Sequence, residues 1–196
     1  MKLYYAIGAC SLADRIALAE AGIACEFERV DLHTRTTETG ADYAAINPKG
    51  YVPALVLDSG EMITENIAIL SWIAEQSPKL RPEGPLGWFR LLEALAYIST
   101  EVHKSFHAFF VPDVTEEAKD KARALASLRL EYLAASLGDG FLLGPDLTVA
   151  DPYLFVIMTW ARPNGVVLPA PLAAYFERMK ARPAVAAALA SEGLQV

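Results

Sequence analysis

The sequence predicts an α/β domain followed by an all-helical domain, and two observations carry this prediction. Short strand patterns and helix patterns alternate over the first part of the chain, in the order β, α, β, short α, β, β, α. The segment QSPKLRPEGP at residues 76–85 is rich in proline and has no periodicity, and beyond it no strand pattern recurs. We therefore expect an α/β domain at residues 1–77, a linker at 78–85 and an all-helical domain at 86–196.

The first helix pattern has marked ends. Ser11 is expected as the N-cap, with Asp14 three positions later as in a capping box, and Gly22 is expected to end the helix. Around it, the remaining patterns of this half are strands at residues 2–6 and 25–32, a polar loop at 33–40 and at most two helical turns at 42–46.

Cys10 lies directly before this helix. The positive end of the helix dipole and the nearby Arg15 favour a thiolate at that position, whereas Asp14 opposes it. A purely structural cysteine would show the same pattern, so both interpretations stay open from the sequence alone. The other cysteine, Cys25, is most simply a core residue, and a single disulfide between the two is not expected.

The stretch NPKGYVPALVLDSGEMITEN, residues 47–66, combines a strand with a helix start. Residues 51–57 read as a strand, and the bond between Val52 and Pro53 is a candidate for the cis form. A cis bond would turn the Val52 N–H and C=O outward, able to grip an extended peptide as an added strand would. A turn at 58–61, a short strand at 62–63 and a helix over 65–75 capped by Thr64 follow. A plain structural turn before Pro53 is the alternative.

The second half of the chain shows only helix patterns. Residues 87–110 are expected to form one long helix with an apolar stripe. Thr115 is expected to cap a helix that runs to residue 137, and Thr148 with Asp151 forms a capping box for a helix that reaches residue 160. Two short helices are expected at residues 171–182 and 184–191.

The composition excludes several classes of function. The chain has 196 residues, 54% of them hydrophobic, which is typical of a globular protein. Its net charge of -7 argues against a nucleic-acid partner, which requires a basic face. Because no apolar stretch of membrane-spanning length and no signal-peptide pattern occurs, we expect a cytoplasmic protein with no membrane partner.

Polar residues follow one face of the long helix. Thr100, His103, Lys104 and His107 are spaced at i, i+3, i+4 and i+7, so they project on the same side. Paired histidines can bind zinc, but the sequence offers no further ligands at suitable spacing, so we expect no metal. The face is either solvated or, given the phenylalanines that follow, the wall of a partly apolar cleft.

These segments resemble a known family. MKLYY and GACSL at the start, NPKGYVPAL and ITENIAIL in the middle, EVHKSF in the long helix and LTVADPYLF near the end occur in the order and spacing of bacterial beta-class glutathione S-transferases. The resemblance covers almost the whole chain. It implies a thioredoxin-like N-terminal domain, a helical C-terminal domain and a homodimer.

The resemblance also implies the site. Cys10 and His103 would be catalytic, with Cys10 beside the glutathione sulfur and able to form a mixed disulfide with it. The Val52 backbone would hold the cysteinyl part, Glu65 and Asn66 the γ-glutamyl part and Arg35 the glycyl carboxylate. The full set of expected glutathione contacts is Ala9, Arg35, Tyr51, Val52, Pro53, Glu65, Asn66, Thr100 and Lys104, and the expected electrophile contacts are Phe106, Phe110 and Trp160.

The activity implied is conjugation of the glutathione thiolate, with glutathione as co-substrate, to small hydrophobic electrophiles, as in detoxification. A thiol-disulfide exchange enzyme that uses Cys10 is the first alternative, and a glutathione-binding protein without activity is the second. Reductive dehalogenation stays open. The chain departs from the family at Asp14 and Arg15, where relatives often have Pro-His, so Cys10 can experience a different field.

Overall fold

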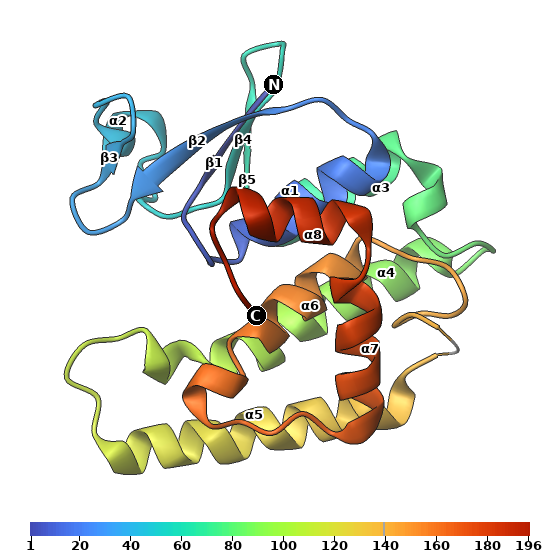
Figure 1. Ribbon diagram of the computed structural model, residues 1–196. Coiled ribbons are helices and arrows are strands. Elements are labelled where there is room, and N and C mark those ends of the chain that lie inside the picture. The colour runs from blue at the N-terminus through green and yellow to red at the C-terminus, as the bar shows by residue number, and fades with distance from the viewer. Residues whose placement is uncertain (139) are drawn as a thin grey trace.

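The computed structural model describes residues 1–138 and 140–196, and it has an α/β domain packed on a helical domain (Figure 1). The sheet has the strand order β3-β2-β1-β4-β5, in which β1 pairs with β2 in parallel and with β4 antiparallel. The strands are β1 (Lys2–Tyr5), β2 (Glu26–Asp31), β3 (Thr36–Thr37), β4 (Ala54–Val56) and β5 (Met62–Thr64).

Helix α1 (Ser11–Ala21) is the element on which both domains pack. It contacts α3 (Asn66–Gln76) beneath the sheet, and α6 (Ala150–Thr159) and α8 (Pro183–Ser191) of the helical domain. Every residue from Ser11 to Leu18 is consequently buried. The start of this helix is therefore held from all sides. The short α2 (Tyr43–Ile46) lies at the far side of the sheet, near β3.

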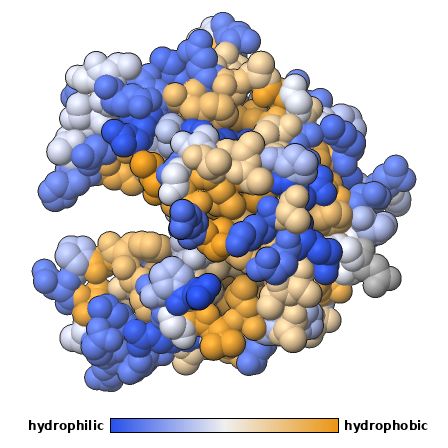
Figure 2. Space-filling view, in the orientation of Figure 1, coloured by the Kyte–Doolittle hydropathy of each residue, from blue (hydrophilic) through white to orange (hydrophobic). Residues whose placement is uncertain are grey.

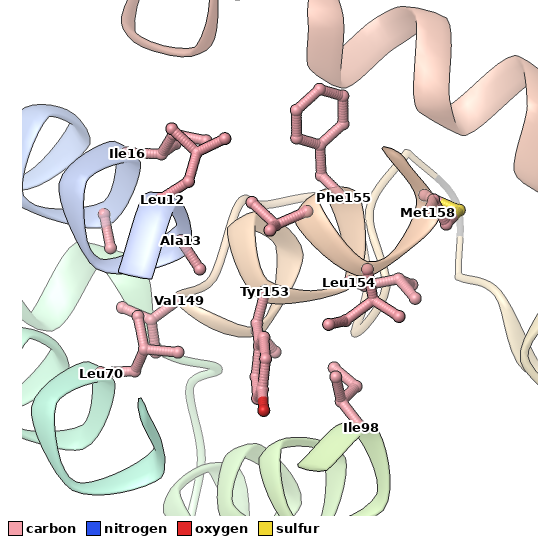
Figure 3. Close-up of a cluster of buried hydrophobic side chains, with 14 of the residues drawn as sticks. Leu12, Ala13, Ile16, Leu70, Ile98, Val149, Tyr153, Leu154, Phe155 and Met158 are labelled. Atoms are coloured by element: carbon pink, nitrogen blue, oxygen red, sulfur yellow. The ribbon is translucent and has the colours of Figure 1, made fainter. Parts of the chain in front are cut away.

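The core runs without a break from the α/β domain into the helical domain. Figure 3 shows Leu12 and Ile16 of α1 next to α6, whose Tyr153 and Phe155 point to opposite sides of that helix, and all of these side chains are buried. Against α6 pack α4 (Gly87–Tyr97) and α7 (Ala170–Lys180), and α5 (Glu116–Ser136) packs against α7. Since the elements after residue 64 are helices, the predicted α/β-plus-helical fold class is confirmed, while the domain limits at 77 and 86 stay a prediction.

The single long helix expected at residues 87–110 is wrong. After α4 the chain widens into a π-helix (Ile98–His103), and a 3-10 helix (His107–Phe109) follows a short helical stretch. Thr100 Oγ1 donates to the Ala96 carbonyl at 3.0 Å, a local bond of the kind that competes with the regular helical pattern. π-Helical turns are frequent at functional sites, and this one carries Thr100 and His103.

Several expected element ends are also corrected. Cys10, not Ser11, is the N-cap of α1 and makes no side-chain cap bond, while Asp14 is fully buried instead of closing a capping box. Glu65, not Thr64, precedes α3. The strand expected at 51–57 is confined to Ala54–Val56, so Pro53 stands before it, and the loop expected at 33–40 contains β3.

Other local predictions are confirmed. The Val52–Pro53 bond is cis. Thr115 caps α5 by accepting from the Ala118 N–H at 3.3 Å. The Thr148 N–H donates to Asp151 at 2.7 Å, which is the carboxylate half of the expected capping box, although Val149 and not Thr148 is the N-cap of α6. A 3-10 helix (Pro78–Leu80) lies within the expected linker, and another (Arg162–Asn164) follows α6.

Candidate active site

The segment before β4 presents main chain toward the start of α1. The Tyr51 carbonyl accepts from Tyr43 Oη at 3.0 Å and from Asn47 Nδ2 at 2.8 Å, so the chain entering the cis bond is fixed from the protein side. The Val52 carbonyl lies 3.9 Å from Cys10 Sγ. The expected main-chain clamp at Val52 is therefore adjacent to the expected catalytic cysteine.

The electrostatics at Cys10 decide against a thiolate, which the sequence alone left open. Burial, followed by the nearby Asp14 carboxyl, raises the pKa of the Cys10 thiol to about 12, while the N–H groups of Cys10 and Ser11 act in the opposite direction. Without a ligand, desolvation outweighs the helix N-terminus. Cys10 is thus a neutral thiol at neutral pH and can donate a hydrogen bond through its S–H.

Glu65 is a carboxylate held in place by neighbours. Its Oε1 accepts from Tyr51 Oη at 2.6 Å and pairs with Lys49 Nζ. Lys49 first, and then Tyr51, lower the pKa of this carboxyl, so it is ionised near neutral pH. The residue has φ +72°, a conformation that side chains other than glycine adopt rarely and mostly at functional positions. Its side chain is 52% exposed, so it can receive an ammonium from solution.

Asn66 links Glu65 to Cys10. Its Nδ2 donates to the Cys10 carbonyl at 3.1 Å, and its buried Oδ1 has no hydrogen-bond partner among the described residues. Lys49 was not predicted as a site residue. Its position in NPKG, just before the clamp, is the signal that could have indicated it.

Arg35 lies close to Gly50, in the segment that leads to the Val52 clamp. It has φ +56°, and its guanidinium carbon lies 3.8 Å from the place where a Cβ on Gly50 would stand. A side chain at Gly50 would therefore touch the guanidinium, and Gly50 also has a positive φ of +74°. The cation is thus brought close to the segment that enters the clamp, as expected.

His103 faces the site from the helical domain. Its Nδ1 lies 2.9 Å from Tyr153 Oη. Burial, and then His107 and Lys104, lower the pKa of the His103 imidazole to about 4, so the ring is neutral at neutral pH. Burial raises the pKa of the Tyr153 phenol, which keeps its proton and can donate to Nδ1, leaving Nε2–H as a donor. Tyr153 was not predicted, because its position in α6 reads as ordinary core.

Trp160 forms the boundary between the two halves of the site. Its ring meets His103 and Phe110 edge-on, each with 4.9 Å between ring centroids, and its Nε1 donates to the Gly8 carbonyl at 2.9 Å. Phe110 is 57% exposed and can contact an apolar ligand. Phe106, by contrast, is fully buried under Trp160, so its expected role as an electrophile contact is wrong. It supports the indole from beneath.

The residues expected in the site lie in two groups that meet at the loop from Gly8 to Cys10. Val52, Glu65 and Asn66 approach from the α/β domain, and His103 and Trp160 from the helical domain. Figure 2 shows a deep indentation between the two domains, at the left of the view. Thr100 in the π-helix and Lys104 in the short helical stretch after it are exposed.

Comparison with known proteins identifies the family. The family model for the glutathione S-transferase N-terminal domain matches residues 9–76, and that for the C-terminal domain matches residues 100–192. The chain is 42% identical to a glutathione S-transferase of Escherichia coli O157:H7 over the whole of both chains. The chain belongs to the glutathione S-transferase family.

Solved glutathione S-transferases share the overall fold. A sphingomonad enzyme solved with glutathione is 44% identical over all of both chains, with a TM-score of 0.93. The bacterial beta-class enzyme of Sphingomonas chungbukensis is also 44% identical over all of both chains, with a TM-score of 0.91. The predicted family, bacterial beta-class glutathione S-transferase, and the predicted transferase activity are confirmed.

Two further observations concern metals and membranes. Within residues 1–138 and 140–196 of this glutathione S-transferase, no group of three or more His, Cys, Asp or Glu side chains is arranged to hold a metal ion. None of the described helices has the length and apolar character needed to cross a membrane. The cytoplasmic location stays a prediction.

Proposed function

We propose that this glutathione S-transferase binds reduced glutathione along the Val52 clamp and transfers its sulfur to a small apolar electrophile, as enzymes of detoxification do. The observation that carries the proposal is the clamp itself. The Val52 carbonyl lies 3.9 Å from the Cys10 thiol, and the Asn66 amide donates to the Cys10 main-chain carbonyl at 3.1 Å, so a peptide paired with Val52 would have its sulfur beside Cys10. The sphingomonad relative was solved with glutathione.

The charges around the clamp fit the ends of the tripeptide. The ionised Glu65 carboxylate suits the γ-glutamyl ammonium, and N–H groups at the start of α3 suit the α-carboxylate. Arg35, beside Gly50, suits the glycyl carboxylate. Glutathione would then lie extended between Glu65 and Arg35, with its cysteine over Val52.

Ionising the bound thiol is the main electrostatic task. Lowering a thiol pKa by ~2 units requires roughly 2.7 kcal/mol of differential stabilisation. A helix N-terminus contributes about 0.3–1 kcal/mol, and a hydrogen bond to a charged acceptor about 1.5–3 kcal/mol. The neutral Cys10 S–H, and the His103 Nε2–H when Tyr153 donates to Nδ1, are suitable donors. Together they supply the required amount.

Transfer then needs only a bound electrophile. The glutathione thiolate attacks the electrophilic carbon, a sulfur–carbon bond forms, and the leaving group departs with its electron pair as an anion. The exposed Phe110 offers apolar ring surface at the helical side of the site, and the largely buried Trp160 packs edge-on against it. Holding both reactants there supplies part of the rate enhancement. A titration of thiolate absorbance with glutathione tests this, and a bound thiol that stays protonated at neutral pH would contradict it.

The structure does not favour thiol-disulfide exchange through Cys10. That reaction requires Cys10 as an attacking thiolate, and burial and Asp14 keep its thiol neutral. A neutral thiol beside the glutathione sulfur suits hydrogen-bond donation instead.

Replacing Cys10 distinguishes these roles. Cys10→Ser keeps a donor and is expected to retain most transferase activity, whereas Cys10→Ala is expected to lower kcat/KM by ~10-fold or more and to raise the pKa of bound glutathione. Because the Cys10 thiol stays neutral, intact mass after incubation with oxidised glutathione at neutral pH should show little adduct at Cys10. Rapid formation of an adduct that is lost in Cys10→Ala would show that Cys10 does attack as a thiolate.

The lowered pKa of His103 predicts a pH dependence of stability. The folded-state pKa of about 4 lies below the ordinary value of 6.5, so the unfolded chain binds a proton more readily between these values. The stability that the neutral, buried His103 contributes is fully present above pH 6.5. It decreases by up to ~3 kcal/mol as the pH falls from 6.5 to about 4. Chemical denaturation at several pH values should therefore show a smaller acid loss for His103→Gln than for the wild type. Equal losses would remove His103 as the cause.

We also propose that the enzyme is a homodimer. Leu125, Leu128 and Tyr132 of α5 are exposed apolar residues on one helix face, and Phe89 of α4 is 64% exposed. Leu91 of α4 is fully buried and does not add to this surface. Exposed apolar residues that gather on one helix face are typical of an interface. A two-fold pairing of the helical domain of one subunit with the α/β domain of the other would cover it.

Sedimentation equilibrium tests the dimer. At micromolar protein we expect about twice the chain mass of 21.3 kDa. Leu128→Glu should shift the equilibrium toward monomer by ~100-fold or more in Kd, because it places a charge in an apolar interface. Val167→Glu, at an exposed apolar residue far along the chain from α4 and α5, is the control and should stay dimeric. A wild-type monomer that binds glutathione would contradict the proposal.

A further inference from the structure

Both main-chain groups of Gly8 are tied to the helical domain. The Gly8 N–H donates to Glu192 Oε2 at 2.9 Å, and the Gly8 carbonyl accepts from Trp160 Nε1 at 2.9 Å. Gly8 has φ +68°, which glycine adopts at little cost. Gly8 lies in the loop that leads from β1 to Cys10 at the start of α1. Residues more than 150 positions apart in the sequence therefore fix the loop that precedes the catalytic cysteine.

Glu192 is held rigidly for this contact. Its side chain is fully buried, and its Oε1 lies 3.4 Å from Arg15 Nε, an ion contact. The Arg15 guanidinium in turn lies over the rings of Tyr5 and Phe27, 4.2 and 4.0 Å from their centroids. Burial raises the pKa of the Glu192 carboxyl, against the opposing effects of the Gly8 N–H and Arg15. A buried acceptor with these partners has little freedom to move.

The second contact connects the loop to the other half of the site. The indole that donates to Gly8 also meets the His103 and Phe110 rings, each at 4.9 Å between centroids. Trp160 and Glu192 thus hold Gly8 from the same domain that carries His103. The position of the loop is consequently set relative to His103.

We propose that Glu192 is a positioning residue for the transferase reaction, acting through Gly8 on the placement of Cys10 against the glutathione sulfur. Glu192 contacts neither Cys10 nor the clamp. By fixing the Gly8 N–H, it fixes the aim of the Cys10 thiol and of the N–H groups that begin α1. Misplacement of a reacting group by ~1 Å can cost ~100-fold in rate, so a loosened loop should be measurable. The inference rests on the proposed function.

Three variants separate positioning from general stability. Glu192→Ala removes the acceptor, and Glu192→Gln keeps a neutral acceptor for the Gly8 N–H. Glu20→Ala is the matched control, because Glu20 also ties α1 to the helical domain, through bonds of 2.7 and 2.8 Å to Arg182, yet does not contact Gly8. For each, we would measure the pKa of bound glutathione by thiolate absorbance, kcat and KM with an aryl halide, the glutathione Kd and Tm.

Glu192→Ala is expected to raise the bound-thiol pKa by about 1 unit and to lower kcat by ~10-fold, with glutathione Kd within ~3-fold of wild type, because Val52, Glu65 and Asn66 are untouched. Glu192→Gln should recover most of both losses, and Glu20→Ala should lower Tm without moving the thiol pKa. If Glu192→Ala keeps the wild-type thiol pKa and kcat, the positioning role of Glu192 is overturned while the proposed transferase function stands. If wild-type enzyme does not ionise bound glutathione, the proposed function is overturned as well.

Discussion

Replacing Glu65 by glutamine is expected to weaken glutathione binding by ~2–4 kcal/mol, the loss typical when a charged partner is removed from a partly closed site. The Glu65 carboxylate already engages Lys49 and Tyr51, with the Tyr51 oxygen at 2.6 Å, so its geometry is set before the ligand arrives. Glutamine keeps the shape and removes the charge that the γ-glutamyl ammonium requires. Isothermal titration calorimetry measures the change directly.

The control for this variant is Glu61→Gln. Glu61 is an exposed carboxylate in the turn before β5 that accepts from Ser59 at 3.1 Å, and its replacement should leave affinity unchanged. Neither variant should shift Tm strongly without ligand, because both carboxylates are largely exposed. Unchanged affinity in Glu65→Gln would remove Glu65 from the glutathione site.

The largest expected effect on stability is that of Asp151→Ala, a loss of about 3–5 kcal/mol. The fully buried Asp151 carboxylate accepts from the N–H groups of Leu142 and Thr148 at 2.8 and 2.7 Å, and from the hydroxyls of Thr148 and Tyr175 at 2.9 and 2.8 Å. Alanine leaves these buried donors without an acceptor. This aspartate thus joins α6, α7 and the segment before α6.

Urea unfolding measures this loss. Asp146→Ala, an exposed aspartate in the same segment, is the matched control and should change the free energy of unfolding by less than about 0.5 kcal/mol. If Asp151→Ala and Asp146→Ala unfold at the same urea concentration, the hydrogen bonds of Asp151 do not contribute about 3–5 kcal/mol to the free energy of unfolding.

The parts of the fold that could be predicted from sequence are those determined locally. The bonds of Thr115 to Ala118 and of Thr148 to Asp151 form as expected because capping depends on neighbours within a few residues. The Ser11 capping box failed because Asp14 is enclosed by α3, α6 and α8 packing around α1, which the sequence does not show. The π-helical turn at Ile98–His103 was missed for a related reason, since its residues keep an ordinary helix pattern.

In the candidate site, too, the features that depend on nearby residues could be predicted and those that depend on distant contacts could not. The Val52–Pro53 bond and the position of Cys10 beside the clamp were accessible from NPKGYVPAL and GACSL. Phe106 was placed in the site because it follows the histidine face, but the end of the helix turns it beneath Trp160. Glu192 and Tyr153 gave no signal, because their roles arise only from contacts between segments distant in the sequence.

The central claim is that the bound glutathione thiolate attacks carbon, with Cys10 as a donor. The most direct measurement is a product analysis by mass spectrometry of purified enzyme given glutathione with a nitro-activated aryl chloride and, in parallel, glutathione with a mixed disulfide. The account predicts the aryl thioether and stoichiometric chloride in the first reaction, with the second no faster than its uncatalysed rate. Rapid disulfide exchange with no thioether would contradict it.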